Sequence, residues 1–204
     1  MPRDKTESHE RIISAAKTEF LTCGFENASM RRIAANAGIT VSGLYKHFPS
    51  KEDMFAQLVQ PMLDEFDELY RQKEQEEHDA LERFGSSAAF LNEDAIYVMS
   101  FIYDHFDAFK LLVCCSQGTR YEDYSHKLAE MEEESSLRFI EALRRRGDSV
   151  PEFDRREFHL LVSSNVEAVL QRIRHDFTRE EALHYAQTIN TFFAKGWKWL
   201  CGME

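Results

Sequence analysis

Apolar side chains recur every three or four positions along most of the chain, which is the spacing of one face of an α-helix. The first such stripe covers residues 7–20 and ends at Gly24. A second, shorter stripe follows Ser29 and a third follows Thr40, both good N-cap residues, with Gly38 in the turn between them. No stretch alternates apolar and polar residues for long enough to predict a strand. The pattern therefore predicts an all-α fold of about nine helices, with a helix-turn-helix near the N-terminus.

The same spacing continues through the rest of the chain and predicts longer helices there. A connector helix is expected over about residues 50–76, and Pro61 inside it is expected to introduce a kink. That kink is either a lever for a signal or a static bend. Residues 95–103 are nearly all apolar, so we expect a helix that is buried on all sides. Thr178, with Glu181 three residues later, predicts the capped start of the last helix.

The predicted third helix has one apolar side and one polar side. Leu44 and Phe48 stand four residues apart and can anchor the helix to its neighbours. The other side is small, hydroxylated and basic, which suits insertion into a DNA groove. Val41 can meet a thymine methyl group, Gly43 allows a close approach, and Lys46 can reach a phosphate or a guanine. We therefore interpret this segment as a recognition helix.

The charge of the chain is unevenly distributed. Its net value is −11, which taken alone argues against nucleic-acid binding. Residues 1–51, however, hold eight Lys or Arg against five Asp or Glu, whereas the remainder holds 17 against 31. A basic segment on an acidic body presents one end to phosphates and repels them elsewhere. With 204 residues, 43% of them hydrophobic, the chain is also long and apolar enough to bury a core.

The four cysteines and the absence of long apolar runs indicate the compartment. Cys23, Cys114, Cys115 and Cys201 include no pair at CxxC spacing and lie within apolar helical patterns. We therefore expect reduced thiols rather than a disulfide or zinc framework. The first residues are polar, and no apolar run approaches the length of a membrane span. These features predict a soluble, cytoplasmic protein.

Residues from about Ile12 to Phe55 resemble the DNA-binding domain of the TetR family of transcriptional regulators. This segment is roughly a quarter of the chain, and many spaced positions agree. In one departure, the family commonly has Gly at the place of Ser42, whereas here Gly43 follows it. The residues that carry the resemblance are Ala15-Ala16 with Phe20, Gly24-Phe25, Ser29, Ile33-Ala34, Ala37-Gly38-Ile39-Thr40, Leu44-Tyr45-Lys46-His47-Phe48 and Lys51-Glu52.

The resemblance assigns further contacts with the DNA backbone. It places the hydroxyl of Tyr45, the ring of His47 and the ammonium group of Lys51 at phosphates. As ordinary alternatives, Tyr45 can be a core aromatic residue and His47 a solvated one. Arg31 and its neighbour Arg32 either flank the groove or form a charged face. Together, the predicted DNA contacts are Ser29, Arg31, Thr40, Val41, Ser42, Gly43, Tyr45, Lys46, His47 and Lys51.

Members of the family usually hold an effector pocket in the helical body, so the resemblance implies one here. Apolar walls with few polar groups are typical of small-molecule pockets, although an aromatic stripe at helical spacing is more often part of a plain core. We divide the chain into a DNA-binding domain, residues 1–50, and an effector-binding and dimerisation domain, residues 51–204. The candidate lining residues are Phe90, Tyr97, Phe101, Tyr124, Met131, Ser135 and Asn165.

The resemblance also implies a homodimer in which the last two helices of each subunit form a four-helix bundle. Two-fold symmetry would place two recognition helices one turn of DNA apart, on a palindromic operator. The last helix has the most regular apolar stripe in the chain, although a chain of this length can bury that stripe within itself. The expected interface residues are Phe158, Val162, Asn165, Val169, Tyr185, Ile189, Phe192, Phe193 and Trp197.

Other functions have weaker support. A di-iron enzyme needs two Glu-x-x-His motifs with further carboxylates, and the chain has only Glu181 with His184, beside Asp123 with His126. We find no phosphate loop or nucleophile elbow, and we expect no enzymatic activity, metal or cofactor. A helical protein-interaction module and a ligand-independent regulator remain as alternatives. The sequence thus predicts a dimeric DNA-binding regulator, most simply a repressor that a small molecule releases from its operator.

Overall fold

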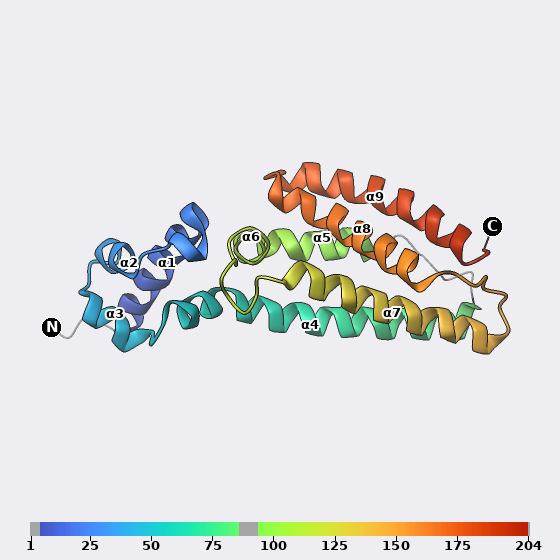
Figure 1. Ribbon diagram of the computed structural model, residues 1–204, viewed down its shortest axis with the longest axis horizontal. Coiled ribbons are helices and arrows are strands. Elements are labelled where there is room, and N and C mark those ends of the chain that lie inside the picture. Colours follow the sequence, from blue (N-terminus) through green and yellow to red (C-terminus); the bar gives the residue numbers. More distant parts are fainter. Residues whose placement is uncertain (1–4, 86–93, 204) are drawn as a thin grey trace. The chain divides into compact units, whose positions relative to one another are not determined.

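The computed structural model describes residues 5–85 and 94–203 of the chain, and no strand occurs within these ranges (Figure 1). The predicted all-α fold is confirmed. No helix in the described part of the chain is long and apolar enough to span a membrane. The helices are α1 (Lys5–Asn27), α2 (Met30–Asn36), α3 (Val41–His47), α4 (Lys51–Phe84), α5 (Asp94–Asp104), α6 (Phe106–Cys114), α7 (Tyr124–Arg146), α8 (Arg155–Arg174) and α9 (Arg179–Leu200).

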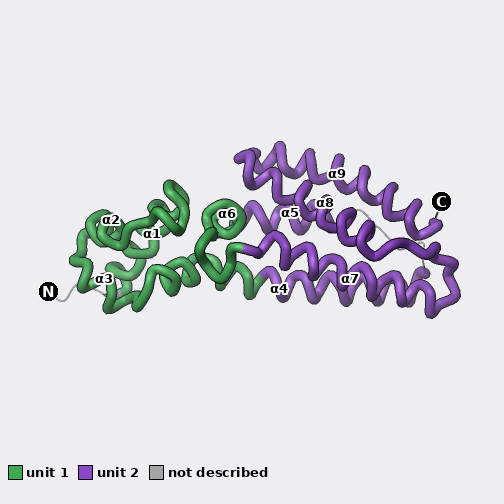
Figure 2. The backbone as a smooth tube through the Cα atoms, viewed as in Figure 1, with its two compact units in different colours: residues 1–65, 105–122 green, residues 66–104, 123–204 purple. Residues whose placement is uncertain are grey.

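The chain forms two compact units, shown in different colours in Figure 2. The head unit comprises residues 1–65 and 105–122, and the body unit comprises residues 66–104 and 123–204. These units differ from the predicted domains, because the start of α4, the helix α6 and the loop after α6 all group with the N-terminal helices. Each compact unit therefore consists of two separate segments of the chain, and no single position in the sequence divides the units.

In the head unit, α1 packs against α2 and α6, and α2 packs against α3. Glycine residues set the two breaks that the sequence predicted. Gly24 (φ 73°) interrupts α1 near its end, and Gly38 (φ 68°) forms the turn between α2 and α3. Both angles are positive and therefore favour glycine over any L-residue. The core between these helices includes Phe20, Leu44 and Phe55, each 0% exposed.

Helix α4 is longer than predicted and continues without interruption through Pro61 to Phe84. The hydroxyl of Ser50 accepts the N–H of Asp53 (3.0 Å) and so caps the start of this helix. Residues 71–79 are strongly charged yet helical, because ion pairs one turn apart stabilise that stretch, such as Lys73 with Glu76 (2.6 Å). Whether Pro61 bends the helix stays a prediction.

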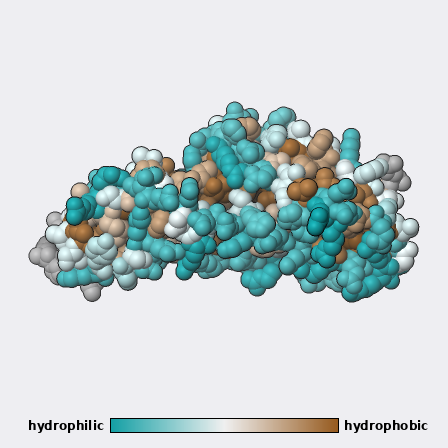
Figure 3. Space-filling view, in the orientation of Figure 1, coloured by the Kyte–Doolittle hydropathy of each residue, from teal (hydrophilic) through white to brown (hydrophobic). Residues whose placement is uncertain are grey.

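In the body unit, α7 packs against α8, and α9 packs against both α5 and α8. The predicted capping box of α9 is present, since Thr178 and Glu181 exchange hydrogen bonds with each other's backbone N–H. The prediction that α5 is buried on all sides is wrong. Ile96 is 38% exposed and Tyr97 is 55% exposed, because an apolar composition does not determine how many neighbours surround a helix. On the face shown in Figure 3, hydrophobic residues lie exposed among the hydrophilic ones.

Candidate functional site

Helix α3 turns one side into the head unit and leaves the other side free. Leu44 is fully buried, and Phe48, just after the helix, is 4% exposed, so both are core anchors as predicted. Tyr45 is 49% exposed, and Lys46 is exposed as well. Within the described chain neither side chain forms a hydrogen bond or an ion pair. The polar side of α3 is therefore available to an external partner.

Thr40 caps α3 in the predicted way, because its Oγ1 accepts the backbone N–H of Gly43 (3.0 Å). A Cβ atom added at Gly43 would lie 3.2 Å from that same Oγ1. The absence of a side chain at Gly43 therefore makes room for the cap itself. Its predicted close approach to DNA stays a prediction, as do the contacts of Ser42 and Val41, which lie in the first turn of the helix.

The two arginines of α2 have different roles. Arg32 donates through Nε to Oε1 of Glu19 (2.7 Å) and through Nη2 to the carbonyl oxygen of Asn27 (2.9 Å). Glu19 is only 7% exposed, and it also accepts the backbone N–H of Ser29 (2.8 Å). The hydrogen bond from Arg32 lowers the pKa of Glu19, and the N–H of Ser29 acts in the same direction against the opposing effect of burial. Arg32 is thus a structural residue that ties α2 to α1.

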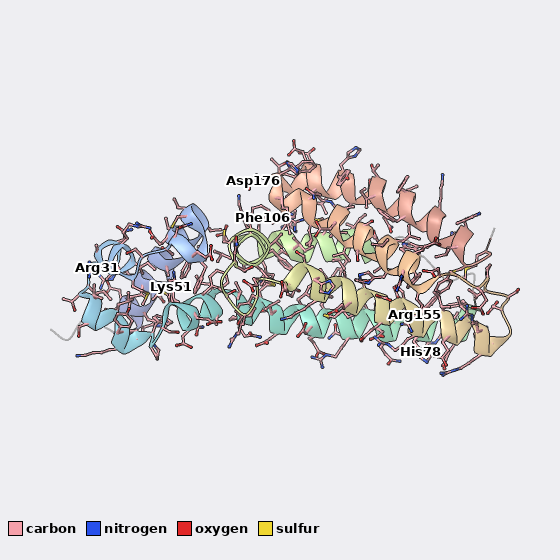
Figure 4. All side chains as sticks on the ribbon, viewed as in Figure 1. Arg31, Lys51, His78, Phe106, Arg155 and Asp176 are labelled. Carbon is pink, nitrogen blue, oxygen red and sulfur yellow. The ribbon has the colours of Figure 1, made fainter. Side chains whose placement is uncertain are left out.

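Arg31, in contrast, is exposed and has no hydrogen bond or ion pair to the described residues; it is labelled on α2 in Figure 4. Of the two arginines, Arg31 is the one whose five donors remain available to phosphate. The hydroxyl of Ser29 is not used as the cap of α2, although Ser29 occupies the N-cap position.

Lys51 does not have the free ammonium group that the resemblance implied. Its Nζ donates to the carbonyl oxygens of Phe25 (2.6 Å), Glu26 (3.1 Å) and Ala28 (3.2 Å), and it lies 4.4 Å from the centre of the Phe25 ring. An ammonium group has three donors, so these bonds use all of them. Figure 4 labels this residue in the head unit. Lys51 is therefore a structural tie between α1 and α4, and its predicted phosphate contact stays a prediction.

The first turns of α1 contribute to the same surface, which the sequence did not indicate. The ring of His9 stacks on Phe48 (5.3 Å between centres) and lies 6.2 Å from the ring of His47. An open hollow beside α3 is lined by Ser8, Gly38, Ile39, Thr40, Gly43 and His47. The apolar periodicity of α1 could not reveal this role, because His9 meets Phe48 and His47 only when the helices of the head unit pack together.

Residues 105–122 form a second set of contacts in the head unit. The backbone N–H of Phe25 donates to the carbonyl oxygen of Cys115 (2.9 Å), and Lys17 pairs with Asp107 on α6 (2.6 Å). The hydroxyl of Tyr121 donates to Gln60 on α4 (2.9 Å). The segment therefore contacts both α1 and α4. Its sequence, which looked like an ordinary part of the body, gave no sign of this arrangement.

Contacts within the body unit bring several candidate effector residues against one stretch of α4, residues 66–74. Phe90 lies outside the described residues. Tyr97 is 55% exposed, with the ammonium group of Lys73 5.0 Å from its ring centre, and Phe101 packs against Phe66 with ring centres 5.8 Å apart. Asn165 is half-buried on α8. Their role as pocket residues stays a prediction.

Three candidates lie on α7 and face α4. The carbonyl oxygen of Met131 accepts the hydroxyl of Tyr70 (3.4 Å), and the hydroxyl of Ser135 donates to Glu74 (3.3 Å). Tyr124 is 8% exposed, and its hydroxyl group has no hydrogen-bond partner. Burial raises the pKa of this phenol well above its ordinary value.

Two ionisable groups of the body unit, the half-buried Glu132 and the buried Arg172, were missed by the sequence reasoning. Glu132 lies beside Glu74, Glu77 and Tyr70, and burial, together with Glu77, raises the pKa of its carboxyl group to about 7. Arg172 on α8 is 2% exposed. In the sequence both look like ordinary polar positions on amphipathic helices, and only packing shows that they face inward.

The predicted dimer residues lie on different sides of α8 and α9, and they differ in how much they are buried. Phe158 and Val162 are 2% and 3% exposed and belong to a core cluster of the body unit itself, and Trp197 packs on Phe158. Phe158 and Val162 are therefore not available to a partner subunit, and this part of the prediction is corrected. Phe192 is 70% exposed. The others, Asn165, Val169, Tyr185, Ile189 and Phe193, are half-buried.

Three exposed apolar residues on the same two helices were missed, because the sequence stripe was assigned to its more buried side. Leu160 and Leu161 on α8 are 64% and 44% exposed, and Trp199 on α9 is 66% exposed. With Phe192 they are four large apolar side chains exposed to solvent on α8 and α9. Exposed apolar residues that gather in one patch are typical of an interaction surface.

The metal and enzyme hypotheses gain nothing from the described residues. Glu181, the acid of the single Glu-x-x-His motif, caps α9 through Thr178, which lowers the pKa of its carboxyl group. No group of three or more His, Cys, Asp or Glu suited to a metal ion occurs in the part of the chain that the structure describes.

A helix-turn-helix whose second helix keeps a polar, partly basic side free places the head unit in the class of helix-turn-helix DNA-binding domains. Residues 12–58 match the family model described as bacterial regulatory proteins, tetR family. The resemblance inferred from the sequence is thereby confirmed for the N-terminal domain, since residues 12–58 match the TetR family of bacterial regulatory proteins.

Comparisons with individual proteins agree. An HTH-type transcriptional regulator of Staphylococcus aureus (strain MRSA252) is 32% identical over 118 residues, 58% of each chain. Another from strain USA300 is 35% identical over 91 residues, 45% of this chain and 49% of that protein. The chain thus spans about half the length of the curated relatives it matches.

Two solved structures share the fold over nearly the whole chain. NalD of Pseudomonas aeruginosa, described as the secondary repressor of the MexAB-OprM multidrug efflux pump, has a TM-score of 0.55 at 16% identity, over 91% of this chain and 95% of its own. A TetR-like transcriptional regulator from Rhodococcus sp. RHA1 has a TM-score of 0.53 at 18% identity, over 99% of both chains. At these identities the likeness concerns the fold alone.

Proposed function

We propose that this protein is a dimeric, ligand-responsive transcriptional regulator in the cytoplasm, and that it acts as a repressor which a small molecule releases from a palindromic operator. The observation that carries the proposal is the division of α3 into a buried and a free side. Leu44 is 0% exposed, whereas the adjacent Tyr45 is 49% exposed. A seven-residue helix with so little core surface is well suited to present side chains to a groove.

Each free side chain has a role in this proposal. Val41 contacts a base edge, while Lys46, Tyr45 and His47 contact phosphates or, for Lys46, a guanine. Arg31 on α2 adds a phosphate contact from the flank of the groove. Lys51 acts at one remove, because it holds the start of α4 against the end of α1.

The dimer rests on the exposed apolar residues of α8 and α9. Leu160, Leu161, Phe192 and Trp199 are each more than a third exposed, and a second copy of the chain buries them in a two-fold interface. The two-fold axis then explains why the operator is palindromic. NalD, which shares the fold, is itself described as a repressor.

Control by a ligand is supported by the path of the chain. Residues 105–122 leave α5 and enter α7 of the body unit, yet they bond to α1 and α4 of the head unit. An effector that binds the arrangement unable to grip DNA more tightly shifts the population toward it. The size of that shift is set by the difference between its two affinities.

Selection of bound fragments from random duplex DNA tests the proposal. We expect a palindrome to be enriched, and we expect Val41→Ala to change the preferred base at one position in each half-site while Tyr97→Ala, in the body unit, leaves the preference unchanged. If no sequence is enriched, the head is a protein-interaction module instead. If a palindrome is enriched but Val41→Ala leaves the preference unchanged, the placement of α3 in the groove is wrong.

A further inference from the structure

Arg172 is a buried cation that lacks an anionic partner. Its side chain lies between α5, α8 and α9 and is 2% exposed. Nη1 lies 3.4 Å from the sulfur of Met99, the guanidinium carbon lies 4.9 Å from the centre of the Tyr185 ring, and Nε has no hydrogen-bond partner. A thioether is a weak acceptor and an aromatic face is not an anion, so the charge is poorly compensated.

Arginines of the body unit that are better exposed show how unusual this is. Arg174, half-buried and two residues further along α8, pairs with Glu167, and the exposed Arg138 pairs with Glu74. Buried arginines are nearly always paired, because removing an uncompensated charge from water is costly. In an acidic protein with 36 Asp and Glu, none of the described carboxylates pairs with Arg172.

The surroundings of Arg172 define what can pair with it. Tyr103, Phe177 and Tyr185 supply aromatic surface, with the hydroxyl of Tyr103 occupied by the carbonyl oxygen of Phe177 (2.8 Å). Met99 is flexible and can yield the space beside Nη1. Burial lowers the pKa of Arg172, opposed by the two tyrosines, yet a guanidinium group remains charged at neutral pH.

We propose that Arg172 is the receptor for the carboxylate group of a small hydrophobic acid, which binds between α5, α8 and α9 and accepts hydrogen bonds from the guanidinium group. A planar carboxylate matches the fork of one guanidinium group. A phosphate dianion calls for more than one cation, and the neighbouring Arg174 and Arg179 are already paired with Glu167 and Asp104. The partner subunit cannot supply the anion, because the side chain is enclosed within one chain. This inference rests on the proposed function, since it names the class of effector.

The test uses two matched pairs of probes with the full-length protein: phenylacetate against phenylacetamide, and octanoate against octanamide. Calorimetric titration and the midpoint of thermal unfolding are the readouts. We expect at least one acid to bind and raise the midpoint, while its uncharged amide does not. Arg172→Met is expected to fold, because it removes an unpaired buried charge. We expect its affinity for the acid to be lower than that of the wild type by a factor of about ten or more.

Two further variants complete the test. Arg172→Lys keeps the charge but loses the fork, so we expect weaker binding that still favours the acid over the amide. Arg174→Met removes a nearby arginine that is already paired and should bind the acid as the wild type does. The proposal is overturned if neither acid binds the wild type, if the amides bind equally well, or if Arg172→Met and Arg172→Lys both keep wild-type affinity.

The same titrations, repeated with a selected duplex, separate this inference from the proposed function. We expect the acid to weaken DNA binding of the wild type and to leave that of Arg172→Met unchanged. If the acid binds through Arg172 but DNA affinity does not change, the site stands and ligand control is overturned. If no duplex is ever enriched, DNA regulation is overturned, while the comparison of acid with amide still decides the role of Arg172.

Discussion

The ammonium nitrogen of Lys51 lies 2.6 Å from the carbonyl oxygen of Phe25, and the N–H of the same Phe25 donates to the carbonyl oxygen of Cys115 (2.9 Å). The end of α1 is thus held from two directions, by the first residue of α4 and by the loop after α6. A lysine that a DNA-binding surface would place at a phosphate instead closes the last turn of a helix, where carbonyl groups lack partners of their own.

Replacing Lys51 should therefore lower the free energy of unfolding of the head unit. Lys51→Met removes hydrogen bonds from a charged donor to three carbonyl groups, and we expect a loss of about 2 kcal/mol in the free energy of unfolding. Urea denaturation measures it. The matched control is Lys46→Met, which removes an exposed lysine without partners and should leave stability unchanged. Equal stability of Lys51→Met and the wild type would contradict the assignment.

Lys46 should instead govern the electrostatic part of DNA binding. Lys46→Gln is expected to weaken binding to a selected operator and to unrelated duplexes alike, and to reduce the slope of log affinity against log salt concentration by about 1. Fluorescence anisotropy at several salt concentrations measures that slope. Arg32→Gln serves as the comparison, because Arg32 is already paired with Glu19 and its loss should leave the slope unchanged. An unchanged slope in Lys46→Gln would remove Lys46 from the interface.

Glu19 should make the head unit less stable at low pH than at neutral pH. Its pKa is lowered in the folded state by Arg32 and by the N–H of Ser29, so its contribution is present above the unfolded-state pKa of about 4.5 and is lost as the pH falls through the folded value. Glu19→Gln should cost about 1–3 kcal/mol at neutral pH and less in acid, where the wild type has lost the same interaction. Unfolding measured at both pH values decides it. A cost that does not depend on pH would mean that packing, not the ion pair, is lost.

Glu132 should have the opposite effect in the body unit, which should become less stable as the pH rises. Its carboxyl pKa of about 7 lies above the unfolded value, so the native state holds a proton that the unfolded state releases, and stability falls as the pH rises from about 4.5 to 7. Above that window the penalty is at most about 3 kcal/mol. Glu132→Gln should remove this slope and be more stable than the wild type at pH 8. A pH profile parallel to that of the wild type would show that the carboxyl group titrates normally.

The proposed dimer can be tested through a single exposed side chain. Phe192→Arg places a charge in the apolar surface of α8 and α9, and we expect sedimentation to show monomers where the wild type is dimeric. Tyr97→Arg is the control, since Tyr97 is also an exposed aromatic residue but lies on α5. A Phe192→Arg protein that remains dimeric would place the interface elsewhere.

Local signals in the sequence were sufficient for the elements of the head. Gly38 and Thr40 determine a turn and a helix start through their own backbone and side-chain chemistry, and the spacing of Leu44 and Phe48 shows which side of α3 is buried. The family resemblance rests on the same residues. None of these features depends on residues far away in the chain, which explains why they could be predicted.

Tertiary packing decided everything that requires two distant segments to meet. Lys51 and Phe25 are 26 residues apart, so no periodicity could show that the lysine is occupied. On α8 the apolar stripe is wide enough to cover a core side and a free side, and only the position of neighbouring helices assigns Phe158 to the first and Leu160 to the second. Arg172 looks like any surface arginine until α5 and α9 enclose it. The sequence by itself thus determined which helices form in the head and that α3 keeps a polar side free. Which charges are free was decided only by the fold, because burial and pairing are properties of the assembled helices.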